Sequence, residues 1–154
     1  MQQIYMTAIA RSHEAIRFIP NPTPEMCMMA VAKHWTAIRF ITDPTREMCM
    51  EAIRQYYEAI KYIQNPTEEM CRFAIRQNPK ALSLIKNPTL EMCLDVATTS
   101  PSLLSHITDK EILLKCIMKN WEVIFFTEAT DEMYLEALKS DFMIMAHIDP
   151  ESTL

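Results

Sequence analysis

Apolar and polar positions alternate along this chain in a pattern that returns about every 22 residues. In the copy at residues 45–53, apolar or small residues stand at Met48, Cys49, Ala52 and Ile53, which is the spacing of one buried stripe on a helix. A second apolar group follows at positions 59, 60, 62 and 63. Each copy is therefore predicted to contain two short helices, each with one buried side.

A seven-residue motif marks the start of the first helix in each regular copy. It reads NPTPEMC at 21–27, DPTREMC at 43–49, NPTEEMC at 65–71 and NPTLEMC at 87–93, and it is altered to EATDEMY at 128–134. When the copies are aligned on their shared glutamate, the successive steps are 22, 22, 22, 20 and 21 residues. Units therefore begin near residues 1, 23, 45, 67, 89, 109 and 130.

Threonine and proline predict where these helices begin and end. Thr23 precedes Pro24, an arrangement in which threonine caps a helix and proline takes the first helical position, where no backbone N–H is needed. An Asn or Asp before the first proline of the motif, as before Pro22, is disfavoured in the α region, so the preceding helix must end there. Hairpins this short are marginal alone and must pack against their neighbours.

These features predict an all-α fold, an α-solenoid of about seven short αα-hairpin repeats in which residues 1–154 form a single helical-repeat domain. No apolar run approaches the roughly 20 residues of a membrane-spanning helix. The N-terminus lacks the pattern of a secretion signal. We therefore expect a cytoplasmic protein that does not interact with a membrane.

The cysteines and methionines are interpreted as core residues. Cys27, Cys49, Cys71 and Cys93 share one column of the repeat, whose other occupants are Tyr5, Leu113 and Tyr134. Met26, Met48, Met70, Met92 and Met133 share the preceding column with Ile4 and Ile112. No CxxC pair occurs, and the four histidines follow no ligand spacing, so no metal site is expected.

The chain contains no glycine, which excludes several catalytic motifs. A P-loop, a GxGxxG dinucleotide turn and a GxSxG nucleophile elbow all require it. The repeated glutamate stands in the first turn of a helix, where a carboxylate interacts favourably with the helix dipole. Capping explains this glutamate better than acid catalysis does, so we expect no enzymatic activity and no cofactor.

One candidate binding column is the first residue of the second helix. It is a large ring at Trp35, Tyr57 and Trp121, and rings with a polar edge are favoured anchors in protein interfaces. An alternative interpretation is that each ring covers the neighbouring hairpin.

The other candidate column lies four residues further along and holds Arg17, Arg39 and Lys61. Basic residues at the end of the first helix, among them Arg54 and Arg76, flank it. Cations also suit the negative end of a helix, which explains part of this pattern. A solvated face with Glu14–Arg17 and Glu58–Lys61 pairs is an alternative explanation.

Charge is distributed unevenly between the two halves of the chain. Residues 1–77 hold nine Lys and Arg against eight Asp and Glu, whereas residues 78–154 hold six against twelve. Arginine matches the geometry of carboxylates and phosphates, so the N-terminal half could bind an acidic protein surface or a phosphate-bearing ligand. The acidic second half argues against nucleic acid as a partner.

The motif NPTxEMCxxAI, followed by AIRFI or AIKYI, resembles the short helical-hairpin repeats of uncharacterised function found in phage, giant-virus and bacterial proteins. The resemblance covers residues 5 to 148 and weakens from 109 onward, where the proline turn and the cysteine column are lost. It implies a viral or mobile-element origin and no catalytic residues.

Together, the residues and the resemblance predict a non-enzymatic protein-binding module that inhibits or sequesters a host factor, such as a defence protein, in the host cytoplasm. The alternative is a binder of a phosphate-bearing ligand or nucleic acid through the arginine-rich half. The apolar segment at 142–146 could instead support homo-oligomers, or could form the buried helix of the final hairpin.

Overall fold

The computed structural model describes residues 1–140 of the chain. The apolar segment at 142–146, a candidate for self-association, lies outside this range. Within the described range every regular element is a helix.

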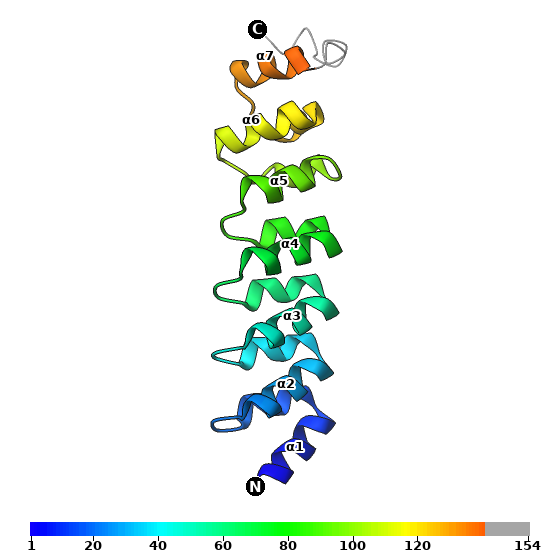
Figure 1. Cartoon of the computed structure of the whole chain (residues 1–154), viewed down its shortest axis with the longest axis vertical. Coiled ribbons are helices and arrows are strands. Elements are labelled where there is room, and N and C mark those ends of the chain that lie inside the picture. The colour runs from blue at the N-terminus through cyan, green and yellow to red at the C-terminus, as the bar shows by residue number, and fades with distance from the viewer. Residues whose placement is uncertain (141–154) are drawn as a thin grey trace. The chain divides into compact units, whose positions relative to one another are not determined.

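The helices alternate between α-helices of eight to ten residues and shorter 3₁₀ helices (Figure 1). The α-helices are α1 (Gln2–Arg11), α2 (Pro24–Lys33), α3 (Arg46–Gln55), α4 (Glu68–Gln77), α5 (Leu90–Ala97), α6 (Lys110–Lys119) and α7 (Asp131–Ser140). The 3₁₀ helices are η1 (His13–Phe18), η2 (Trp35–Phe40), η3 (Tyr57–Tyr62), η4 (Pro79–Leu84), η5 (Pro101–Leu104) and η6 (Trp121–Phe126).

The elements form two compact units, one from Met1 to Ile85 and one that begins at Lys86. In the first unit, α1, α2, α3 and α4 pack in series, and η1, η2, η3 and η4 do the same (Figure 1). In the second unit α5 packs against α6, α6 packs against α7, and η5 packs against η6. This translational order confirms the predicted all-α solenoid of short hairpin repeats.

The second helix of each hairpin differs from the prediction, because it is a 3₁₀ helix rather than an α-helix. In η2 the amide of Ala37 donates to the carbonyl of His34 at 3.0 Å, and the amide of Ile41 donates to that of Ile38 at 3.2 Å. Most of these segments are only six residues long and end at the proline turn, and helices this short commonly adopt the tighter i→i+3 bonding.

Threonine caps the regular α-helices as the motif predicts. The side chain of Thr23 accepts a hydrogen bond from the amide of Met26 at 3.3 Å, and Pro24 occupies the first turn. The same bond recurs from the methionine amide to Thr45, Thr67 and Thr89. In this glycine-free chain the left-handed conformation at the first turn falls on Asn21, with φ of 51°, and asparagine tolerates that region better than most residues.

The cysteine and methionine columns form much of the core, as predicted. All five cysteines are buried and free, and the methionines of the repeated motif are buried beside them. Ile4, in contrast, was expected in this core but is 66% exposed. Among the described residues α1 packs chiefly against α2 and η1, and Ile4 lies on a side of the helix that neither covers. Burial raises the pKa of the Cys93 thiol to about 12 and that of Cys116 to about 11, which keeps both thiols protonated and unreactive at neutral pH.

Hydrogen bonds between neighbouring hairpins set the register within each unit. The side-chain amide of Gln55 donates to the carbonyls of Val31 and Ala32 at 2.8 and 3.3 Å, which lie near the end of the preceding α-helix. Equivalent bonds run from Lys33 to Ala10, from Gln77 to Arg54 and from Asn120 to Ala97. Carbonyls in the last turn of a helix have no partner within the helix, so these donors both satisfy them and align successive hairpins.

Candidate functional site

Cations and rings alternate at the ends of three consecutive 3₁₀ helices in the first unit. Each helix ends in a basic residue followed by a ring: Arg17–Phe18 in η1, Arg39–Phe40 in η2 and Lys61–Tyr62 in η3. We call these six residues the cation–aromatic stripe. The 3₁₀ period explains why the stripe is at the surface, because it turns Ile60 and Ile63 to the core while Lys61 stays exposed and Tyr62 half-buried.

Two arginines of the stripe lie over aromatic rings. The guanidinium carbon of Arg17 is 4.9 Å from the ring centroid of Phe18 and 5.4 Å from that of Phe40 in the next hairpin. The guanidinium carbon of Arg39 is 4.5 Å from the Phe40 centroid. These are cation–π distances, and they restrict where the two guanidinium groups can move. Phe18 is 75% exposed, so the first ring also presents apolar surface to a partner.

The three cations differ in whether a carboxylate already neutralises them. The ammonium of Lys61 is 2.6 Å from a carboxylate oxygen of Glu58, which confirms one predicted pair. This hydrogen bond raises the pKa of Lys61 and lowers the pKa of Glu58. The other predicted pair does not form, since among residues 1–140 neither Arg17 nor Arg39 has a carboxylate within ion-pair distance. The N–H groups of these two arginines are therefore available to an external anion.

A pocket of about 460 Å³ adjoins the stripe between the ends of η2 and η3. Arg39, Phe40 and Tyr62 line one part of it, and the turns at 41–44 and 63–65 line another. Arg46 also contributes, although its guanidinium already donates to Glu69 at 2.6 Å. The volume falls in the range of small-molecule sites.

Trp35 contacts the neighbouring hairpin. Its ring centroid is 5.2 Å from that of Tyr56 and 6.1 Å from that of Tyr62, and the side chain is half-buried. Tyr57 is also half-buried, with its centroid 5.0 Å from that of Tyr56 in its own hairpin. For Trp35, the interpretation that the ring covers the next hairpin is thus the one that the contacts support.

Two histidines extend this group of rings toward η1. The His13 and His34 rings stack with centroids 4.6 Å apart. The hydroxyl of Thr36 lies 2.8 Å from Nδ1 of His34 and 3.0 Å from Nε2 of His13. Burial lowers the pKa of His13, and the neighbouring His34 lowers it further. The lowered pKa favours the neutral form of the His13 ring.

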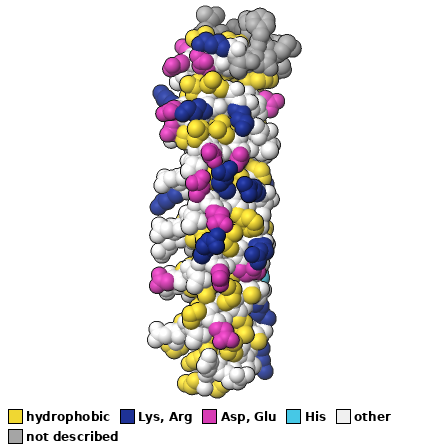
Figure 2. Space-filling view, viewed as in Figure 1, with side chains coloured by type: hydrophobic (Ala, Val, Ile, Leu, Met, Phe, Trp, Pro, Cys, Tyr) yellow, Lys and Arg dark blue, Asp and Glu magenta, His cyan; other side chains and the backbone are white. Residues whose placement is uncertain are grey.

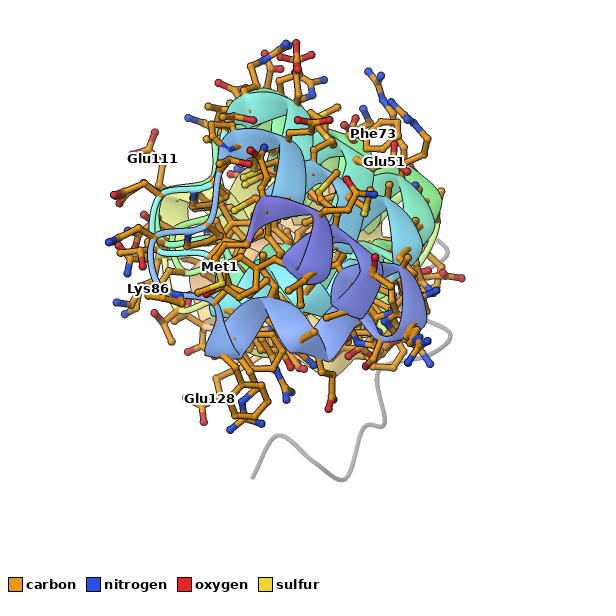
Figure 3. The ribbon with its side chains drawn as sticks, turned by 90° about the horizontal axis from the view of Figure 1, so that it is seen from below. Met1, Glu51, Phe73, Lys86, Glu111 and Glu128 are labelled. Carbon is orange, nitrogen blue, oxygen red and sulfur yellow. The ribbon has the colours of Figure 1, made fainter. Side chains whose placement is uncertain are left out.

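Arg54 and Arg76 lie at a different part of their hairpins from the stripe. Both stand at the end of an α-helix, whereas the stripe lies at the far end of the following 3₁₀ helices. Arg54 forms an ion pair with Glu51 and lines a separate groove with Met28 and Met50. Glu51 points outward on the same side as Phe73 (Figure 3). Arg76 is exposed.

Trp121 belongs to the second unit. Its ring meets Phe125 edge-on with centroids 5.6 Å apart, and the two rings line a groove of about 550 Å³ together with Phe126. Phe125 and Phe126 are exposed at 47% and 42%. Rings and hydroxyl groups line this groove, and Glu122 is its charged residue, so it differs chemically from the stripe.

Phe18, Phe40 and Tyr62 were absent from the sequence-based candidates. The signal was present, since each ring follows a basic residue of the candidate column. Spacing alone places these rings in the buried stripe of an α-helix. Only the 3₁₀ geometry shows that they reach the surface. On the face seen in Figure 2, hydrophobic side chains are likewise exposed between acidic and basic ones.

Within residues 1–140, no group of histidine, cysteine, aspartate and glutamate side chains could hold a metal ion. In the same part of the chain, every helix is too short or too polar to cross a membrane. No family model, curated protein or solved structure matches the chain.

Proposed function

We propose that this protein is a non-enzymatic protein-binding module and that the cation–aromatic stripe is its contact surface. The observation that supports this most directly is the state of Arg17 and Arg39. Both guanidinium groups lie on rings and lack a carboxylate partner among the described residues.

Such a surface is suited to an acidic partner. A guanidinium that already lies on a ring loses less conformational freedom when it binds, and it can offer two parallel N–H groups to one carboxylate. The adjacent rings provide apolar area that becomes buried in the same contact. Arginine and aromatic side chains are also the residue types that contribute most to protein interfaces.

The test is a triple charge reversal of Arg17, Arg39 and Lys61 to glutamate. Cross-linked partners would be captured from the native host and quantified by mass spectrometry. We expect the triple variant to lose its specific partner while its circular dichroism and Tm stay close to those of the wild type. The matched control reverses Arg76, Lys80 and Lys86, three exposed cations that are not part of the stripe. Equal capture by the wild type and the stripe variant would reject the proposal.

A phosphate-bearing small ligand is the second candidate, and the pocket beside Arg39 is the observation that favours it. Arg39 and the rings of Phe40 and Tyr62 could hold an anion next to a flat group. Asp43 in the same lining, and the pairing of Arg46 with Glu69, reduce the positive potential there. A nucleotide that raises the Tm of the wild type but not of the Arg39→Glu variant would support this candidate over the first.

The role of this module in a host follows only from the resemblance to repeats of viral and bacterial proteins. A binding module of viral or mobile-element origin would act by occluding or sequestering a host protein, such as a defence factor, in the host cytoplasm. The identity of the captured partner would decide this directly.

A further inference from the structure

We propose that the partner presents an acidic polyproline II segment to the cation–aromatic stripe, with one carboxylate at every third residue. This inference rests on the proposed function and specifies the partner's chemistry and conformation. Arg17 and Arg39 would each bind one carboxylate, and Lys61 would mark the end of the site.

The spacing of the stripe limits which partners can follow it. Because both Arg17 distances start from one carbon atom, the ring centroids of Phe18 and Phe40 are at most about 10 Å apart. Packed helices in general lie roughly 8–10 Å apart, and η1, η2 and η3 pack in series. The general packing distance, which agrees with this upper limit, places successive steps of the stripe about 8–10 Å apart, and a partner that follows the stripe repeats its carboxylates at that spacing.

Among the regular backbone conformations, polyproline II places side chains at this spacing. A polyproline II helix has three residues per turn and rises about 3.1 Å per residue, so every third side chain points the same way at about 9 Å. A β-strand turns side chains to one face at about 7 Å or about 13 Å, which misses the spacing. In an α-helix, residues seven apart are about 10.5 Å apart, which is longer than this spacing.

The chemistry of the rings also suits a polyproline segment. Polyproline segments bind along rows of aromatic side chains, because the preformed helix loses little entropy when its proline rings pack on flat apolar surfaces. Phe18, Phe40 and Tyr62 form such a row, and two of its rings lie beneath a guanidinium that has no acidic partner in residues 1–140. Charge and apolar contact are therefore available at the same spacing.

The stripe has a defined length. The column position after Lys61 is Ser83 in η4, which has no charge, and Lys61 is already paired with Glu58. The site thus extends over η1, η2 and η3. Two steps of the stripe correspond to a peptide of roughly seven to nine residues.

The experiment measures binding of dye-labelled synthetic peptides by fluorescence anisotropy at low and moderate salt. The first peptide is built from Glu-Pro-Pro triplets. The second has the same composition with its glutamates clustered at one end, and the third replaces glutamate by glutamine. We expect the first to bind at least roughly tenfold more tightly than either of the others, the effect of placing one extra charge-assisted contact.

Variants of the full-length protein then locate the site. Arg17→Glu together with Arg39→Glu should remove the preference for the triplet peptide, whereas the Arg76→Glu control should retain it. Circular dichroism of each variant checks that the helices are intact.

Each result has a defined meaning. Equal affinity for the triplet and clustered peptides, or no binding of any peptide, overturns the inference. If partner capture is still lost in the triple charge reversal, the proposed function survives and only the polyproline II conformation is wrong. If the triple charge reversal also leaves partner capture unaffected, the proposed function and the polyproline II inference both fail.

Discussion

The threonine before each regular α-helix and the cysteine four residues after it show how a repeated residue takes one structural role in every copy. Thr45 accepts the amide of Met48 at 3.3 Å, and Cys49 is buried next to it. Both roles were predicted from spacing, because a cap and a buried stripe depend on neighbours along the chain. The exposure of Phe18 and Phe40 was not predicted, because it depends on how η1 and η2 are wound.

His13 is the residue whose ionisation we expect to affect stability. Burial and the nearby His34 lower its pKa below the value in the unfolded chain, so the unfolded state binds the proton more readily. Glu14 opposes this shift, whereas Lys33 and Arg39 add to it. The contribution of His13 is therefore complete above about pH 6.5 and is lost as the pH falls below that value.

The prediction is tested with His13→Phe, which retains a ring for stacking. The free energy of unfolding in urea should fall less between pH 7.5 and pH 5.5 in the variant than in the wild type. An identical loss of stability in both proteins would show that ionisation of His13 does not contribute to the pH dependence. His106, which is exposed, supplies the matched control as His106→Phe.

At the scale of elements, pairs of helices are held by side chains that satisfy the backbone of the preceding hairpin. The type and period of the first helix in each hairpin could be predicted, since its caps and its apolar stripe both lie within it. The 3₁₀ winding of the second helix could not, because residues at 59, 60, 62 and 63 suit either helix when only spacing is considered. The choice depends on the short distance between the helix start and the proline turn.

Gln55 provides a test of this inter-hairpin bonding. Replacing it with alanine removes the bonds to the carbonyls of Val31 and Ala32, and we expect a loss of about 1 kcal/mol in the free energy of unfolding. Gln64→Ala, an exposed glutamine in the following turn, is the matched control and should change stability little. Equal effects of the two substitutions in urea unfolding would contradict the role given to Gln55.

At the scale of the whole molecule, stability comes from each hairpin packing on the next within its unit. Contacts in such repeat proteins are almost all between neighbours, so a local defect should weaken nearby hairpins most. The described units both follow this plan, with α-helices packed on α-helices and 3₁₀ helices on 3₁₀ helices.

Ile53→Ala tests this distribution of stability. Ile53 is fully buried in α3, and its truncation should cost about 2–5 kcal/mol. In hydrogen exchange with mass spectrometry, we expect amide protection to fall in α2, α3 and α4 and to change much less in α6. The control Ile117→Ala, at a fully buried position of α6, should give the reverse pattern. Uniform loss of protection throughout residues 1–140 in both variants would show instead that the chain unfolds as one cooperative body.

Sequence by itself determined the repeat length, the helix starts and the buried columns, because these follow from interactions between residues a few positions apart. It also located the cations Arg17, Arg39 and Lys61. Tertiary structure alone decided that Arg17 spans Phe18 and Phe40 of two successive hairpins, and that Trp35 packs on Tyr56 and Tyr62 of the next hairpin. Contacts between groups in different hairpins depend on how the hairpins pack, and packing is not a property of local spacing.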